Sequence, residues 1–328
     1  MDAARTSARR AAAAAVAAVA ALACVLAALV AAGADGASKL RPVSGPLKVA
    51  VGIADQKSWI FGDARLHELG LRYARRSVPW DALRFRDQRR ELDAWMNGVR
   101  MIGAEPLITL AQSKRRPDRP YRAPGVREVE RQFRRFLDRY PDVKTYSTWN
   151  EANMCGAGLC QRPDLVAGYY RAMRRSCPDC QVLAADLLDL PNMVGWVRAF
   201  RRHAGVEPRL WGLHNYIDAN RGETARTAAL LREVRGEVWL TEVGGIVARR
   251  TGSRIKLPQG KAHAARATQF IFDRIARLDA RITRIYFYHW RSSTRRDSWD
   301  SAFIAADGGR RPSLRVLQRA LRNMRADL

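Results

Sequence analysis

Several common signatures of ligand binding are missing from this sequence. It contains no Gly-x-Gly-x-x-Gly or Walker pattern after an early strand, which argues against a dinucleotide site or a P-loop. It also has no zinc finger, RNA-binding aromatic motif or concentrated basic tail, so we do not expect nucleic acid as a partner. No repeat of about 20–50 residues is present, which excludes a solenoid or a propeller.

Acidic residues are scarce: 32 Asp and Glu stand against 58 Lys and Arg, a formal charge of +26. Such a charge suits acidic polymers or an anionic cell envelope. Most of the excess, however, is Arg spread along segments of helical periodicity, as in Arg131, Arg134, Arg135 and Arg139, which is typical of a solvated helix face. Association with an anionic envelope is therefore a secondary expectation.

The N-terminus is predicted to lie outside the fold. Arg5, Arg9 and Arg10 precede an apolar Ala/Val/Leu run from Ala11 to Ala32, and Ala32-Gly33-Ala34 forms a small-x-small cleavage pattern. Residues 1–36 are thus expected to be a secretory signal peptide, or a membrane anchor if the segment stays uncleaved. The protein would then be secreted, or held at the outer face of the membrane. Residues 37–46 are a short linker rich in Ser, Pro and Gly.

Cysteine is sparse, and Cys24 falls within the N-terminal segment. The remaining four, Cys155, Cys160, Cys177 and Cys180, have the spacing C-x4-C-x16-C-x2-C, which is also seen in zinc ribbons. Outside the cytosol disulfides are favoured over a metal. Three connectivities are open, and we prefer the local pairs Cys155–Cys160 and Cys177–Cys180.

From residue 47 to residue 328 strand-like and helix-like segments alternate regularly. The expected strands are Leu47–Ile53, Leu71–Val78, Pro106–Ala111, Val143–Trp149, Val182–Ala185, Leu210–Tyr216, Val238–Thr241 and Ile282–Trp290. The expected helices are Ala64–Leu69, Asp87–Ile102, Val126–Tyr140, Pro163–Arg175, Met193–His203, Thr224–Val234, Ala262–Leu278 and Ser313–Met324. This pattern predicts a single α/β domain, a (β/α)8 TIM barrel, with a doubly wound open sheet as the runner-up. We expect a monomer.

Two glutamates end strands in a similar way. Glu151 follows Trp149 and Asn150 at the end of the fourth expected strand, and Glu242 ends the seventh. The carboxyl ends of the strands of such a barrel meet at one face, where active sites are built. The sequence therefore predicts paired-carboxylate chemistry at this face.

Other strand ends supply polar and aromatic candidates for substrate binding: Arg75, Trp80, His214, Tyr216 and Trp290. Aromatic faces can pack on the apolar faces of sugar rings, and Trp290 is our candidate for such a platform. His214 fits equally well as a substrate contact or as a buried hydrogen-bonding histidine.

With these residues in place, the sequence resembles clan A of the glycoside hydrolases, the retaining (β/α)8 enzymes, over nearly all of residues 47–325. The motifs that carry the resemblance are Trp149-Asn150-Glu151, His214-x-Tyr216, Trp239-Leu240-Thr241-Glu242 and His289-Trp290. The resemblance implies hydrolysis of a poly- or oligosaccharide by double displacement, without cofactor or metal.

The same resemblance assigns the roles. Glu151 would be the general acid/base and Glu242 the nucleophile. Asn150 would hydrogen-bond the sugar 2-hydroxyl, Tyr216 would hold the nucleophile, and Arg75 would keep it ionised. Arg76 is the alternative register for the arginine, because a shift of one residue moves a side chain to the other face of the sheet.

Two features leave the family within the clan, and so the sugar, unassigned: Ala152 replaces the proline common after Asn-Glu, and the adjoining loop is short and carries cysteines. The Arg-rich loops Gln112–Gly125 and Arg291–Asp300 would suit an acidic or phosphate-bearing glycan. The alternative function is a non-catalytic envelope protein that binds a glycan or an anionic polymer on the same scaffold.

Overall fold

The computed structural model describes residues 38–115, 123–157, 159–252 and 254–326. Residues from Leu40 onward form one compact unit, which is the barrel domain discussed below. The predicted signal or anchor, residues 1–36, lies outside the described residues. Within the part of the chain that is described, no helix combines the length and the apolar character needed to span a membrane.

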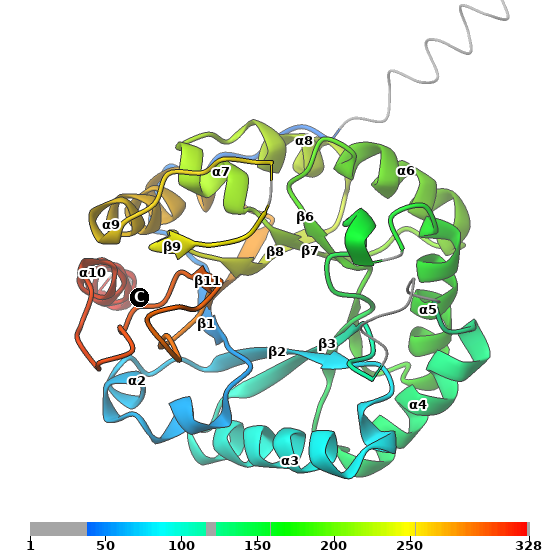
Figure 1. The fold of residues 1–328 in the computed structure, drawn as a ribbon. Coiled ribbons are helices and arrows are strands. Elements are labelled where there is room, and N and C mark those ends of the chain that lie inside the picture. Colours follow the sequence, from blue (N-terminus) through cyan, green and yellow to red (C-terminus); the bar gives the residue numbers. More distant parts are fainter. Residues whose placement is uncertain (1–37, 116–122, 158, 253, 327–328) are drawn as a thin grey trace, which may run out of the picture. The chain divides into compact units, whose positions relative to one another are not determined.

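Parallel strands form the inner layer of the domain, and helices surround them (Figure 1). The strands are β1 (Ala50–Ala54), β2 (Tyr73–Pro79), β3 (Glu105–Ala111), β4 (Thr145–Ser147), β5 (Gln181–Leu183), β6 (Asp186–Leu188), β7 (Leu210–His214), β8 (Glu237–Val243) and β10 (Ile282–Tyr288). They follow the order β5-β4-β3-β2-β1-β10-β8-β7-β6. The predicted TIM barrel is therefore confirmed, and the open doubly wound sheet is not formed.

The fifth expected strand is split into β5 and β6, and this split closes the ring. β5 pairs with β4, whereas β6 pairs with β7. The two residues between them are both bonded to β7: Ala184 donates its N–H to the carbonyl of Leu210, and the carbonyl of Ala185 accepts from Gly212. β5 and β6 are thus the two ends of one barrel strand that changes partner midway.

The outer layer consists mainly of amphipathic helices whose apolar faces pack on the strands. They are α2 (Ala64–Glu68), α3 (Arg86–Met101), α4 (Val126–Arg139), α5 (Pro163–Ser176), α6 (Met193–Ala204), α7 (Tyr216–Arg221), α8 (Ala225–Glu233), α9 (Lys261–Phe270) and α10 (Pro312–Ala326). In α4, for example, Val129, Phe133 and Phe136 are buried, while the arginines face away from the core. This matches the periodicity expected for a helix with one solvated face.

Several boundaries differ from the expected ones, and two of them change the character of a segment. The strand expected to reach Tyr216 ends at His214, and Tyr216 is the first residue of α7. The long helix expected from Ala262 to Leu278 is α-helical up to Phe270 and continues as a π-helical turn. Each deviation lies next to an element end, where sequence periodicity is least informative.

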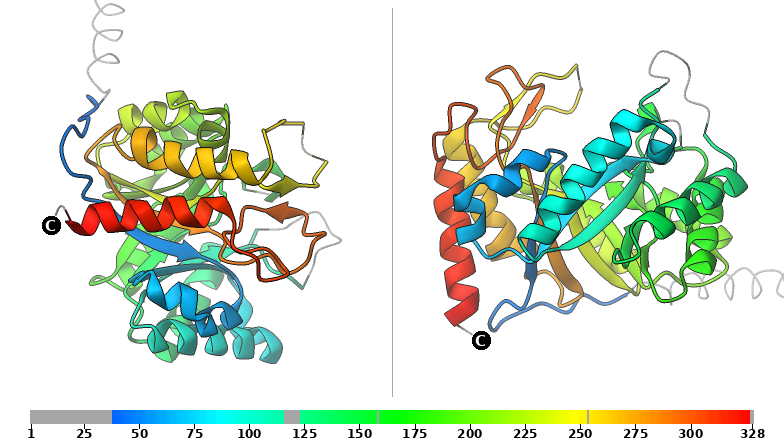
Figure 2. Two further views of the ribbon diagram at one scale, coloured as in Figure 1. Left: turned by 90° about the vertical axis from the view of Figure 1, so that its left-hand side faces the viewer. Right: turned by 90° about the horizontal axis from the view of Figure 1, so that it is seen from below.

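A small antiparallel sheet was not expected from the sequence. β9 (Ala248–Arg249) follows β8, β11 (Trp299–Asp300) follows β10, and the two pair with each other. Figure 2 shows the segments that carry them extending beyond α9 and α10 at one end of the domain. Because β8 and β10 are parallel, this ladder lies at the carboxyl ends of the strands, where the candidate site is found.

Candidate active site

Arg75 on β2 connects the strand ends of this site. Its side chain is fully buried, and Nη1 donates to Oε2 of Glu242 at 2.8 Å. Nη2 donates to Oδ1 of Asn150 at 2.7 Å and to Oδ2 of Asp186 at 2.6 Å. Arg76 points the other way and donates to the carbonyl of Glu91 on α3. Of the two registers considered from the sequence, it is therefore Arg75 that faces the barrel interior.

Asp186, the first residue of β6, is the buried counter-ion of Arg75. It also accepts from the hydroxyls of Thr109 at 2.9 Å and Ser147 at 2.8 Å. Burial alone would raise the pKa of Asp186, but the charge of Arg75 and the nearby His214, whose Nε2 lies 3.7 Å from Oδ2, hold it well below its usual range. The carboxylate is thus ionised at neutral pH and pairs with Arg75 inside the barrel.

Glycine at position 212 makes room for this carboxylate. A Cβ at Gly212 would lie 2.0 Å from Oδ1 of Asp186, well inside van der Waals contact. Because position 212 of β7 has no side chain, the carboxylate of Asp186 can lie inside the barrel.

Glu242 on β8 is held by two donors. Arg75 bonds one carboxylate oxygen, and the hydroxyl of Tyr216 donates to the other at 3.0 Å. Burial and the negative charge of Glu242 raise the pKa of Tyr216 well above its ordinary value, so the hydroxyl keeps its proton and remains a donor. The Glu242 side chain is 13% exposed and faces the cavity described below.

Glu151 lies in the turn that follows β4 and has a φ of 50°, in the left-handed region that non-glycine residues rarely adopt. Such a backbone costs about 1–3 kcal/mol and persists where the surroundings enforce it. Here the next residue, Ala152, donates its N–H to the carbonyl of Asp186. The turn is therefore tied to β6.

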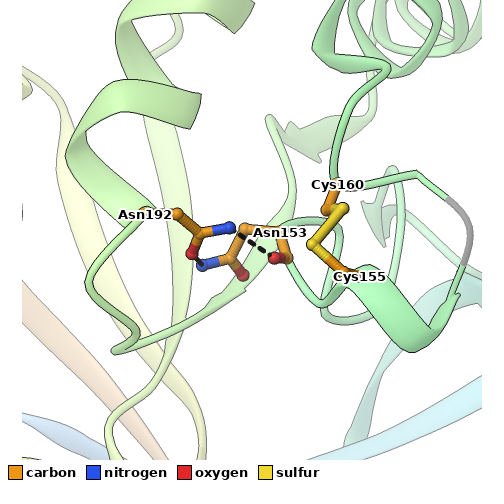
Figure 3. The surroundings of a disulfide bond; sticks show 4 residues. All are labelled: Asn153, Cys155, Cys160 and Asn192. Atoms are coloured by element: carbon orange, nitrogen blue, oxygen red, sulfur yellow. Dashed lines mark hydrogen bonds between the residues drawn. A yellow bond between two sulfur atoms is a disulfide. The ribbon is translucent and has the colours of Figure 1, made fainter.

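The loop that follows Ala152 is also held by hydrogen bonds to β6. Asn153 is buried and exchanges two hydrogen bonds of 2.8 Å with the backbone of Leu188, and Asn192 donates to its carbonyl (Figure 3). Beyond it, Cys155 is bonded to Cys160. The second pair is Cys177–Cys180, so the local pairing preferred from the sequence is confirmed.

His214 ends β7 and is fully buried between the two glutamates. Its Nδ1 lies 3.2 Å from Oε1 of Glu151, and its Nε2 lies 3.1 Å from Nη2 of Arg75. Burial and the charge of Arg75 oppose a second proton on the ring. The charges of Glu242, Asp186 and Glu151 prevail because they outnumber the single guanidinium, and the pKa of His214 rises to about 9. Of the two sequence interpretations, the buried hydrogen-bonding histidine fits.

A cavity of about 470 Å³ opens above this cluster. Its floor includes Glu151 and Glu242, and its walls are largely apolar. The other lining residues are Met154, Leu188, Asp189, Leu190, Tyr216, Ile217, Arg249, Ile255, Leu257, Tyr288 and Trp299. A concave apolar site with a few convergent polar groups is the usual form of a small-ligand site.

The two tryptophans predicted as substrate contacts lie elsewhere. Trp290 is fully buried, and its indole N–H donates to Asp63 at 2.9 Å, so its ring presents no face to a ligand. Trp80 is half-buried against the main core and does not line the cavity. The aromatic rings on the cavity wall are those of Tyr216, Tyr288 and Trp299.

The polar residues named from the sequence thus lie close together in the structure, whereas part of the cavity wall was not anticipated. Trp299 lies within the Arg291–Asp300 loop, for which the sequence analysis considered the arginines and not the aromatic ring. Arg249 had no signal at all, because its place depends on the unexpected pairing of β9 with β11.

Glu151, His214 and Glu242 offer ligand atoms within 4.8 Å of one another, a spacing that could also suit a metal ion. The positive charge at this cluster is already supplied by Arg75, whose guanidinium contacts both Glu242 and His214. A cation bound there would face this guanidinium in a buried site, which disfavours metal binding.

Comparison with solved structures places the fold among glycosidase barrels. The chain is similar to GH5_18 from Streptomyces cattleya in complex with GlcNAc, with 16% identity over 87% of this chain and 82% of that one, at a TM-score of 0.61. It is similar to native xylanase 10B from Thermotoga maritima, with 13% identity over 84% and 95% of the two chains and a TM-score of 0.57.

A third similar structure is the GH39 enzyme from Xanthomonas axonopodis pv. citri, with 14% identity over 86% of this chain and 67% of that one, at a TM-score of 0.59. At these identities the likeness establishes the (β/α)8 fold and does not assign a family. No family model and no curated protein matches the sequence.

Proposed function

We propose that this chain is an exported retaining glycoside hydrolase, with Glu151 as general acid/base and Glu242 as nucleophile. The observation that carries the proposal is the proximity of the two carboxylates: their oxygens lie within 4.8 Å, on the floor of one cavity. Retaining enzymes hold the pair ~5–5.5 Å apart, whereas inverting enzymes need ~6.5–9.5 Å to admit a water molecule between substrate and base.

The environments of the two glutamates suit different roles. Arg75 and Tyr216 each donate a hydrogen bond to Glu242, which favours its ionised form and fixes it for attack on the anomeric carbon. Glu151 contacts the Nδ1 of His214, a group that holds a proton at neutral pH. The carboxyl of Glu151 lines the cavity and, among the described residues, is not paired with any arginine or lysine, so it can reach the glycosidic oxygen and exchange a proton with it.

Double displacement then follows. As Glu242 bonds to the anomeric carbon, the bond to the leaving oxygen breaks and that oxygen takes the proton from Glu151. In the second step Glu151 takes a proton from water, which attacks the same carbon and releases Glu242. Asn150 uses its Oδ1 to accept from Arg75, so its amide N–H groups remain to donate to the sugar 2-hydroxyl.

Export is supported by the N-terminal sequence pattern and by the two disulfides, which persist in oxidising compartments. The substrate class, a poly- or oligosaccharide, is consistent with the complexes of GH5_18 from Streptomyces cattleya with GlcNAc and Manb1-4GlcNAc.

The proposal is tested with aryl glycosides of both anomeric configurations, using wild type, Glu151→Ala, Glu242→Ala and, as control, the exposed Glu223→Ala. We expect both site variants to lose at least ~10²-fold in turnover and the control to match wild type. Azide should restore Glu242→Ala with inverted product and Glu151→Ala with retained product. If wild type hydrolyses nothing, or the site variants match it, the chain is instead a non-catalytic binding protein.

A further inference from the structure

Arg249 is the basic residue on the wall of the catalytic cavity, and its surroundings differ from those of Arg75. Its Nη1 donates to the carbonyl of Ile255 at 2.7 Å. Its Nε is buried without a hydrogen-bond partner, and among the described residues no acceptor is bonded to Nη2. Nε and Nη2 form one edge of the guanidinium, the edge that can bind an anion through two parallel hydrogen bonds.

No carboxylate of the described residues lies within ion-pair distance of Arg249. Burial lowers its pKa, and no neighbouring negative charge offsets that effect. Partly buried cations are normally paired, because desolvating a charge is costly unless a counter-charge compensates it.

The backbone around Arg249 is held in place. Arg249 is the cross-strand partner of Trp299 in the β9–β11 ladder, and its N–H donates to the side chain of Gln259 at 2.6 Å. The guanidinium lies 5.3 Å from the centre of the Trp299 ring, a cation–π contact. A binding group fixed on a paired strand is preorganised and loses little freedom when a ligand binds.

The same tryptophan connects Arg249 with the reaction centre. The ring of Trp299 packs edge-on against Tyr216, with 4.6 Å between centroids, and Tyr216 bonds the nucleophile. The acidic groups Glu151, Asp189 and Glu242 also line the cavity. The ionised Glu242 would repel an anionic substituent and Arg249 would attract it, so such a sugar is favoured with its anionic group toward Arg249.

We propose that Arg249 is a specificity-determining residue that binds an anionic group on the sugar, as in a uronic acid or a sugar carrying an acidic ester. This inference rests on the proposed hydrolase function and names its substrate class. The bound anion would accept a hydrogen bond from Nη2 and compensate the charge of the guanidinium, while the Trp299 ring packs beside it.

The test compares matched aryl substrates that differ by one charge: glucuronide against glucoside, galacturonide against galactoside, and a 6-sulfated glycoside against its parent. The variants are Arg249→Gln and, as matched control, the neighbouring exposed Arg250→Gln, whose guanidinium bonds the carbonyl of Asp297. We expect kcat/KM for the charged member of a pair to fall about 10–100-fold in Arg249→Gln, as for loss of a charge-assisted hydrogen bond. The neutral member should change less than about threefold, and Arg250→Gln should affect neither.

A response confined to the uronides identifies a carboxylate, and one confined to the sulfated sugar identifies an ester. Preference of wild type for the neutral sugars, or an equal loss for both members of each pair, overturns the proposal. Calorimetry with methyl uronides and methyl glycosides separates it from the hydrolase proposal. If no glycoside is hydrolysed but uronide binding depends on Arg249, only the hydrolase proposal is refuted. If uronide binding is absent, or is the same in wild type and Arg249→Gln, the anion-site proposal is refuted.

Discussion

Replacing Arg75 with Met gives the sharpest test of how the site is held together. The substitution keeps the approximate length of the side chain but removes the positive charge beside Asp186, which is fully buried, and Glu242, which is 13% exposed. Breaking a buried ion pair by removing one partner costs about 3–5 kcal/mol, because an uncompensated charge stays in the interior. For a domain of this size that corresponds to a fall in Tm of roughly 5–8 °C.

The matched control is Arg100→Met. Arg100 makes a two-pronged contact with Asp142 at 2.8 Å, but both side chains are nearly half exposed, so its loss should cost less than about 1 kcal/mol. The free energy of unfolding of both variants and of wild type is measured by denaturant titration at several pH values, with circular dichroism as the probe.

The pH dependence of the Arg75→Met effect has a definite sign. In wild type the pKa of Asp186 is depressed, so its contribution to stability is present above pH ~4 and is lost as the pH falls further. Without Arg75, burial dominates and favours the protonated acid. The deficit of the variant should therefore be largest at neutral pH and shrink on acidification. A loss no greater than that of Arg100→Met, or one that is independent of pH, would refute the reasoning.

Three further perturbations test neighbouring contacts. Tyr216→Phe removes the hydrogen bond to Glu242, and kcat/KM on the best aryl glycoside should fall roughly 10–100-fold with the fold intact by circular dichroism; an unchanged rate would show that the bond does not serve the nucleophile. His214 has a folded-state pKa of about 9, above its ordinary 6.5, so the stability that it contributes is complete below pH 6.5 and lost as the pH rises through 9. The stability advantage of wild type over His214→Gln should shrink by up to ~3 kcal/mol between pH 6 and 10 in denaturant titrations, and a constant difference would contradict the charged imidazole. Gly212→Ala places a methyl group 2.0 Å from a carboxylate oxygen and should destabilise the fold by at least ~1–3 kcal/mol. The control Gly195→Ala lies exposed on a helix with open space around it and should stabilise the fold by up to about 1 kcal/mol. Equal effects of the two substitutions in thermal melts would contradict the steric argument.

The barrel could be predicted from the sequence because each of its elements is a local pattern. An apolar run such as Val238–Thr241 indicates a strand, and an amphipathic stretch such as Val126–Tyr140 indicates a helix, whatever the rest of the chain contains. The regular alternation of strands and helices along the chain is then compatible with only a few α/β architectures. The split of the fifth strand left no such trace, because the change of partner between Leu183 and Asp186 depends on which strands lie to either side.

The polar part of the site could be anticipated for a related reason. In a parallel barrel, residues at strand ends share one face, so Glu151, Glu242 and Arg75 could be placed together without knowing any distance. The cavity wall depends on loops that cross above this face. The exposure of Trp299 and the burial of Trp290 are set by loop packing, which no short-range pattern encodes.

The two disulfides have a consequence for how the chain matures. Their partners are separated by 5 and 3 residues, so each cross-link joins cysteines that are already neighbours before any strand has paired. Closing short loops costs less chain entropy than closing the longer loops of the other pairings. Correct oxidation should therefore precede folding and need no reshuffling by an isomerase. It also adds no long-range restraint, so the barrel must be assembled by its core, its strand pairing and its buried ion pairs.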